Sequence, residues 1–534
     1  MTAGSTMERP ATGRAAAGTV ADPRGVLAPG PRGVESLLGR PMPTDRLRGW
    51  IVTIVLTLIA GVVRMWDLGR PTDNGTPVFD EKHYVPQTWQ ALRNGGYEDN
   101  PGYELVVHPP LSKQLMAVGQ WIFGYDPVGW RVVSALAGTL CVLLIIRIAR
   151  RLTRSTLLGG IAGVLLICEG LSQVTSRVGM IDIYPTLFVL GAFAAILADR
   201  DDVRGRMAVV VAEGRILDTP FGPRLGVRWW RFAAGLCIGA SLASKWSGLY
   251  YIVFLGALII GFDVAARRAA GVARPWVGTL VRDLAPLVWA CFLLPILIYV
   301  ASWLPWIASE TGTDRHVPDA KADAVTLVAL LPDWLPDWVR GMAYFSSKVL
   351  EFHATLFTPR GNPHPWESKP WTWPMGLRPM LYYYESGAAA PGCGTNDCVG
   401  AVMAIGTPAL WWTAFPVLGW GIWRWITGRD WRYAAVLVGY GAGILPWFTD
   451  IDRQMYFFYM APVIPFLVLA VTLVLGEVLG RRTSGPERRA TGRMVVAIYV
   501  GLVVANFAWL WPILVGASIT AARWNAELWL PSWR

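Results

Sequence analysis

Long apolar stretches recur along almost the whole chain and are separated by polar loops. Each stretch approaches the ~20 residues that an α-helix needs to cross a bilayer. The pattern predicts an all-α polytopic membrane protein without an internal repeat. About eleven spans are expected, at residues 50–67, 131–148, 155–172, 179–198, 229–244, 247–265, 284–304, 403–423, 432–448, 457–478 and 494–514.

Two polar stretches, residues 68–130 and 305–402, are much longer than the other loops. The second contains apolar, tryptophan-rich segments, which are typical of helices that lie along a membrane surface. The spacing of apolar residues predicts a similar helix over residues 111–123, with Pro110 at its first position. A further helix is expected to begin near Val85, because Pro86 favours a first helical turn.

The composition agrees with a membrane protein, since 54% of the 534 residues are hydrophobic and 16% are charged. The net charge of +11 does not indicate a nucleic-acid partner, because the basic residues cluster in short loops between apolar stretches. Residues 1–48 are predicted to be disordered. With an odd number of spans, these residues and four arginine clusters, at residues 147–154, 267–282, 424–432 and 481–493, all lie on the cytoplasmic side. Both long loops and the tail at residues 516–534 then face outward.

Two of the six cysteines, Cys393 and Cys398, lie in a polar segment of the second long loop. A disulfide between them would fit an oxidising outer face, and two free thiols are the alternative. The other four cysteines lie in apolar stretches and are interpreted as small buried side chains.

The strongest chemical signal is the pair Asp80 and Glu81, just after the first span. Adjacent side chains point in different directions, so the two carboxylates are not expected to act on one atom in the same way. One general base and one orienting carboxylate is the functional interpretation, and an exposed acidic cap is the alternative. Both residues are expected in the loop before the helix at Val85.

His108 precedes Pro109 and Pro110, which restrict the backbone to a stiff, extended turn. This turn is expected to bring His108 near the acidic pair. A metal site built from Asp80, Glu81, His83 and His108 is an alternative, although the sequence has no established metal-ligand spacing.

Several charged residues are expected near the outer ends of spans, and they would suit a phosphate if they shared one face. A charged group in the bilayer is costly and tends to line a cavity, although a residue near a span end can also snorkel to water. The candidates are Arg131, Arg177, Asp182, Lys245 and Arg453.

Taken together, these segments resemble the protein O-mannosyltransferases, a family of GT-C-fold glycosyltransferases that use a polyprenyl-phosphate mannose donor. The resemblance is carried by Phe79 to Tyr84 and His108 to Lys113 in the first long loop. It continues at residues 129–136, 176–182, 244–249, 364–374 and 453–462. The second long loop is too short for the soluble domain that eukaryotic members insert there, so the chain resembles a bacterial member.

The resemblance implies a GT-C catalytic domain over residues 49–515 and inverting transfer of mannose to serine or threonine hydroxyls of exported proteins. Asp80 and Glu81 would be the catalytic pair, with Asp80 as the base and Glu81 positioning the acceptor, or the reverse. Candidate contacts to the donor phosphate or substrate are Arg131, Arg177, Lys245, Arg453, Asp182, His108, Lys113 and His364.

No cofactor or metal is expected beyond the lipid-linked donor. The enzyme would lie in the cytoplasmic membrane with its active site on the outer face, where it could work beside the secretion machinery. Two alternatives stay open: another GT-C enzyme that modifies a lipid or glycan, and a membrane transporter. Against a transporter, no pair of broken helices from matching halves is seen.

Overall fold

The computed structural model describes residues 34, 37–99, 107–215, 219–316, 326–332, 334–357, 363–390, 392–393, 396–480 and 483–534. Most of the predicted disordered segment 1–48 lies outside these residues. Its last residues, from Arg46, already belong to helix α2.

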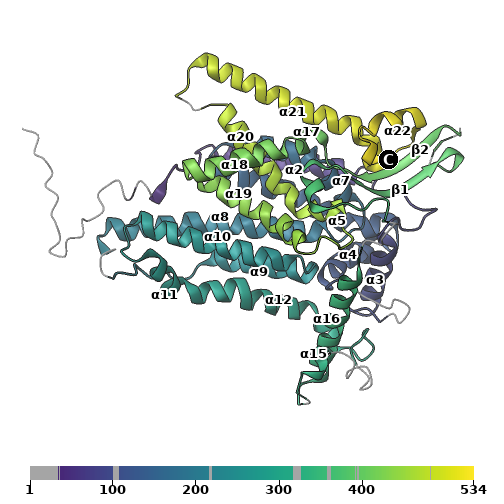
Figure 1. Ribbon diagram of the computed structural model, residues 1–534, viewed down its shortest axis with the longest axis horizontal. Coiled ribbons are helices and arrows are strands. Elements are labelled where there is room, and N and C mark those ends of the chain that lie inside the picture. Colours follow the sequence, from purple (N-terminus) through teal and green to yellow (C-terminus); the bar gives the residue numbers. More distant parts are fainter. Residues whose placement is uncertain are drawn as a thin grey trace, which may run out of the picture.

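Long apolar helices build the body of the protein, as the hydrophobic pattern predicted (Figure 1). Among the described residues, seven helical segments are long and apolar enough to cross a membrane. They are α2 (Arg46–Met65), α5 (Pro127–Thr153), α8 (Ile183–Ala212), α10 (Gly248–Ala269), the continuous stretch Pro275–Ser302 that includes α11 and α12, Phe457–Val478 with α20, and α21 (Pro486–Val515).

An eighth candidate span is bent by 63° between α6 (Thr156–Ile167) and α7 (Gly170–Arg177). The buried carboxylate of Glu169 lies at the break and accepts hydrogen bonds from the amides of Leu171 and Ser172, at the N-terminus of α7. The hydroxyl of Thr407 donates to the carbonyl of Cys168, at 2.8 Å. The backbone groups that the bend exposes are therefore paired inside the protein, as a helix break in a membrane requires.

Three further predicted spans coincide with shorter helices: α9 (Trp229–Ser244), α18 (Ala414–Gly428) and α19 (Trp431–Ile444). The total of eleven spans stays a prediction. Several predicted boundaries are wrong. Helix α8 continues to Ala212, well past residue 198, and the spans expected from residues 284 and 494 already begin at Pro275 and Pro486. The span expected from residue 403 begins later, because residues 398–404 form a strand.

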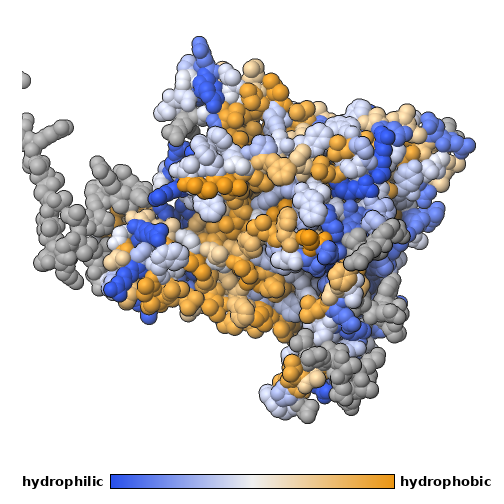
Figure 2. Space-filling view, in the orientation of Figure 1, coloured by the Kyte–Doolittle hydropathy of each residue, from blue (hydrophilic) through white to orange (hydrophobic). Residues whose placement is uncertain are grey.

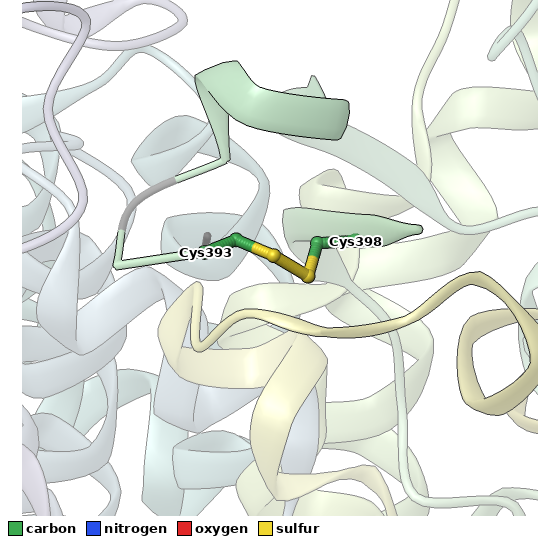
Figure 3. The surroundings of a disulfide bond; sticks show 2 residues. All are labelled: Cys393 and Cys398. Atoms are coloured by element: carbon green, nitrogen blue, oxygen red, sulfur yellow. A yellow bond between two sulfur atoms is a disulfide. The ribbon is translucent and has the colours of Figure 1, made fainter. Parts of the chain in front are cut away.

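The structure adds a small antiparallel sheet to the mostly helical fold. Its strand order is β1 (Met380–Ser386), β2 (Cys398–Ala404) and β3 (Ile519–Thr520). The sheet joins the second long loop to the C-terminal tail, which continues into α22 (Ala521–Glu527). A disulfide links Cys393 to Cys398, at the start of β2 (Figure 3).

The two long loops lie at the same end of the helical bundle. This end carries α3 (Glu81–Arg93), α4 (Leu111–Phe123), α16 (Asp337–Thr355) and the sheet (Figure 1). Helix α4 has the predicted bounds. Figure 2 shows hydrophobic side chains along the middle of the bundle, whereas hydrophilic residues gather toward its two ends.

Candidate active site

The turn just before α3 contains a residue in an unusual backbone conformation, Phe79. Phe79 has a φ of +51°, which costs a non-glycine residue about 1–2 kcal/mol. Its ring stacks on Tyr382 with centroids 4.2 Å apart, and it meets the edge of Phe458 at 6.0 Å. This packing holds the turn in place, and the turn sets the position of the next residue, Asp80, just before α3.

Helix α3 begins at Glu81, four residues earlier than predicted, and Pro86 lies inside it. The side chain of Glu81 is fully buried and accepts four hydrogen bonds. The amides of Val78 and Gly179 donate two of them, at 3.0 and 2.6 Å. Arg131 donates the other two, at 2.7 and 2.8 Å. Glu81 therefore anchors the start of α3.

Arg131 lies on α5 and is 1% exposed. Besides its two bonds to Glu81, it donates to the carbonyls of Leu68 and Pro71, at 3.1 and 2.8 Å. All three guanidinium nitrogens of Arg131 have protein partners. We therefore assign Arg131 the role of holding Glu81, whereas the sequence predicted a contact with the donor.

Two other expected phosphate ligands also have structural partners. Arg177 donates to the carbonyls of Arg64, Trp66 and Asp67, at the C-terminal end of α2. A cation at this end of a helix satisfies carbonyls that have no partner within the helix. Lys113 is buried in an ion pair with Glu98. Both side chains are thus engaged by protein groups in this structure, and their contact with a substrate phosphate stays a prediction.

Asp80 has a different environment from Glu81. Within the described part of the chain, no hydrogen bond or ion pair engages its carboxylate. Its pKa is raised to about 6, mainly by burial; the charge of Asp182 raises it further, while His83 and Lys245 lower it. Asp80 is therefore an uncommitted carboxylate and a stronger base than an ordinary aspartate.

Lys245 and Asp182 form an ion pair beside Asp80. The Lys245 Nζ lies 2.7 Å from Asp182 Oδ1 and 5.2 Å from the ring centroid of Tyr459. Lys245 follows the last residue of α9, and Asp182 precedes the first residue of α8. Two helix ends thus bring a cation to the same site as Asp80.

A second cation, Arg453, is held by a residue that the sequence analysis missed. Arg453 Nη2 lies 3.0 Å from Nδ1 of His353 on α16. A guanidinium can only donate, so this imidazole nitrogen accepts. Burial, Arg453 and Lys245 together lower the pKa of His353 to about 4, which keeps the ring neutral. No local motif marks His353, because its partner lies 100 residues away.

His108 lies near Tyr84 of α3 and near His353, and its approach to the acidic pair stays a prediction. Its ring centroid is 5.9 Å from that of Tyr84 and 6.5 Å from that of His353. Burial and the nearby charge of Lys245 hold the pKa of His108 well below its usual range. His364 contacts the ring of Tyr456 at 5.3 Å, and its Nδ1 accepts from the amide of Trp366. His108 is thus a neutral ring near the cations, and His364 packs against the aromatic residues.

The alternative metal site is not assembled in the described residues. No group of three or more histidine, cysteine, aspartate or glutamate side chains is placed there to hold a metal ion. Both carboxylate oxygens of Glu81, one of the proposed ligands, are bonded to Arg131.

Comparison with known families gives the same assignment in both halves of the chain. The model of the dolichyl-phosphate-mannose-protein mannosyltransferases matches residues 54–304. The model of the C-terminal four TMM region of protein-O-mannosyltransferase matches residues 342–533. The alternatives of a transporter and of an enzyme that modifies a lipid or glycan therefore lose support.

Curated relatives match nearly the whole chain. A polyprenol-phosphate-mannose--protein mannosyltransferase of Mycobacterium tuberculosis is 55% identical over 95% of this chain and 96% of its own length. One of Corynebacterium glutamicum is 41% identical over 90% of this chain and 92% of its own length.

Among solved structures, the protein O-mannosyltransferase Pmt1-Pmt2 complex of S. cerevisiae bound to the sugar donor matches with a TM-score of 0.69. The match covers 94% of each chain at 15% identity, which supports the GT-C fold. The curated relatives and the two family matches place this chain among known enzymes. The chain belongs to the protein O-mannosyltransferase family of glycosyltransferases.

Proposed function

We propose that this enzyme transfers mannose from a polyprenyl-phosphate mannose to serine or threonine hydroxyls of exported proteins. The observation that carries the mechanism is an uncommitted, basic carboxylate, Asp80, within reach of the charge of the Lys245 cation. In a single displacement, the acceptor oxygen forms a bond to the anomeric carbon as the bond from that carbon to the phosphate oxygen breaks. The configuration inverts, and polyprenyl phosphate leaves.

Asp80 accepts the proton of the acceptor hydroxyl. A general base works best when its pKa lies near the working pH, because it is then both deprotonated and basic. A pKa of about 6 meets both conditions near neutral pH. Glu81, which the sequence analysis considered for either role, acts as a positioning residue through its bonds to Arg131.

Lys245 and Arg453 stabilise the charge on the leaving phosphate. Asp182 orients the ammonium of Lys245, and His353 orients the guanidinium of Arg453. The Nε of Arg453 is buried without a hydrogen-bond partner among the described residues, so it has a donor available for a phosphate oxygen. Fixed donors aimed at developing charge are a major source of catalysis, and no cofactor is required for this chemistry.

We further propose that the site faces the outside of the cytoplasmic membrane and that the N-terminus lies in the cytoplasm. The support is the arrangement of the two long loops at one end of the bundle, with arginine-rich loops elsewhere (Figure 1). Residues 49–515 form the catalytic domain and residues 516–534 an outer tail. An acceptor would reach this face as it is exported, and a link to the secretion machinery stays a prediction.

The test is a transfer assay with purified enzyme in detergent, mannose-labelled prenyl phosphate and a peptide rich in serine and threonine. Label in the peptide, with α-linked mannose on a hydroxyl, is the expected result. A matched peptide in which alanine replaces every serine and threonine is the control. Label that accumulates in lipid, or equally in the alanine peptide, would contradict the proposed acceptor.

A further inference from the structure

A cavity lies between α5, α8 and α9, and none of the residues around Asp80 lines it. Its volume is about 430 Å³. Most of its lining is apolar, with the side chains of Leu144, Ile148, Phe188, Ala194 and Cys237 among others. The charged lining residues are Arg147 and Arg151, both on α5. The cavity therefore combines an apolar wall with a strongly cationic part.

The positive charge around this cavity is not balanced by the carboxylates near it. A single carboxylate, that of Asp201, is shared by Arg151, Arg154 and Arg200, at 2.8, 3.0 and 3.2 Å. Arg147 forms no ion pair with any described residue. Its guanidinium lies 4.0 Å from the ring centroid of Trp50, and its Nη1 is buried without a hydrogen-bond partner. An anion with several oxygen atoms would complete this arrangement.

The distance between Arg147 and the active site excludes the donor phosphate as the anion in this cavity. Arg147 follows Arg131 on α5 by 16 residues, which is about 24 Å of helix. The donor phosphate has to lie beside Asp80, so the donor cannot also place that phosphate at Arg147. The cavity is on the membrane-spanning part of α5 and is lined by groups that suit an alkyl chain. Phospholipids supply a phosphodiester and such a chain in one molecule.

We propose that this cavity binds one anionic membrane phospholipid, with its phosphodiester at Arg147 and Arg151 and one acyl chain along α5, α8 and α9. The phosphate oxygens accept from the guanidinium N–H groups of Arg147 and Arg151 that line the cavity, and the negative charge of the headgroup offsets the excess of arginine. The site is a structural lipid site, separate from the site that binds the donor.

The proposal can be tested by native mass spectrometry of delipidated enzyme titrated with phosphatidylglycerol or with phosphatidylcholine. One phosphatidylglycerol is expected to bind each wild-type chain, more tightly than phosphatidylcholine. Arg147→Gln should weaken phosphatidylglycerol about tenfold, since it removes charge-assisted hydrogen bonds. Ala194→Phe, which keeps both arginines and fills the apolar part, should also weaken it. Arg489→Gln, an exposed arginine on α21, is the charge-matched control and should bind as wild type does.

Wild-type enzyme alone can overturn the proposal, so the test does not depend on the folding of a variant. Equal affinity for the two lipids would contradict a site selective for an anionic headgroup. Thermal unfolding gives a second readout. If inorganic phosphate protects the wild type against heat as fully as phosphatidylglycerol does at the same concentration, the acyl chain of the lipid is not recognised, which would contradict the proposal. Arg147→Gln enzyme that folds and keeps wild-type lipid affinity would also overturn it.

Discussion

Three carboxylates lie close to one another at the active site, and their partners give them different tasks. Glu81 accepts four hydrogen bonds and is fixed to Arg131, whereas Asp182 is paired with Lys245. Asp80 has neither kind of partner among the described residues, and its pKa is raised to about 6 by burial first. A group that is free, basic and near the Lys245 cation is the one suited to accept a proton.

The pKa of Asp80 predicts the pH dependence of transfer. Protonation removes the base, so kcat/KM should fall about tenfold per pH unit below pH 6 and level off above pH 7. The positive charge of Lys245 lowers the pKa of Asp80, whereas the negative charge of Asp182 raises it. Removing Lys245 takes away the first effect and leaves Asp182 without its ion-pair partner, so both changes raise the pKa of Asp80. Lys245→Gln should therefore move the acidic limb to higher pH. The measurement is kcat/KM against pH for both proteins.

Lys82→Gln is the matched control for this shift, because Lys82 is an exposed lysine on α3 that pairs with Asp73. Its acidic limb should coincide with that of the wild type. A limb that stays in place in Lys245→Gln, or that moves equally in both variants, would contradict the assignment.

At the scale of single residues, the sequence predicted roles for Asp80, Lys245 and Arg453 but could not separate them from Arg131 and Arg177. The difference depends on carbonyls such as those of Leu68 and Trp66, which belong to other segments of the fold. His353 could not be predicted because it is recognisable only by its contact with Arg453. Residue type and approximate depth are visible in a sequence, and long-range partners are not.

At the scale of elements, the pair of Glu81 and Arg131 ties the start of α3 to α5. Glu81→Gln would leave the buried guanidinium without its counter-charge, and breaking a buried pair from one side costs about 3–5 kcal/mol. The free energy of unfolding in detergent should fall by this order, with loss of transfer. Lys82→Gln removes an exposed pair on the same helix and should cost less than about 1 kcal/mol. Equal stability of the two variants would contradict the anchoring role of Glu81.

The disulfide between Cys393 and Cys398 ties the loop between β1 and β2 to the start of β2. Unfolded, unreduced enzyme should therefore expose four reactive thiols, and reduced enzyme six. Replacing both hairpin cysteines with serine should lower stability by about 2 kcal/mol, as expected for a short closed loop. The checks are thiol counting by mass spectrometry and thermal unfolding. Six reactive thiols without reductant would refute the bond.

Helices were easier to predict than the sheet, for a physical reason. The predicted span 229–244 has the same bounds as α9, because its apolar run has clear polar ends. Strand β2 is also apolar and is followed by the short apolar helix α17 (Pro408–Trp411) and then by α18, so the hydrophobic pattern predicts a span from residue 403. A short apolar run does not distinguish a buried strand from a helix.

At the scale of the whole molecule, the account requires Asp80 and the arginine-rich loops to face opposite sides of the membrane. Single cysteines at Lys82, beside Asp80, and at Arg489, on the exposed start of α21, can report this. A membrane-impermeant maleimide should label position 82 in intact cells and position 489 only after permeabilisation. Unaltered enzyme, whose four free cysteines are buried or half-buried, gives the background. The reverse labelling pattern would place the site in the cytoplasm.

The central claim is that Asp80 accepts the proton of the acceptor hydroxyl, and Asp80→Asn tests it most directly. Asparagine has nearly the same shape, and the Asp80 side chain makes no capping hydrogen bond to lose. The variant should therefore fold and bind donor as the wild type does.

The decisive measurement is the rate of mannose transfer to peptide at saturating substrates. We predict a fall of about 10²–10⁴-fold in Asp80→Asn, the range that general-base catalysis contributes. Asp73→Asn, in the same loop, should transfer at the wild-type rate. A folded Asp80→Asn enzyme that transfers mannose as fast as the wild type would contradict the account.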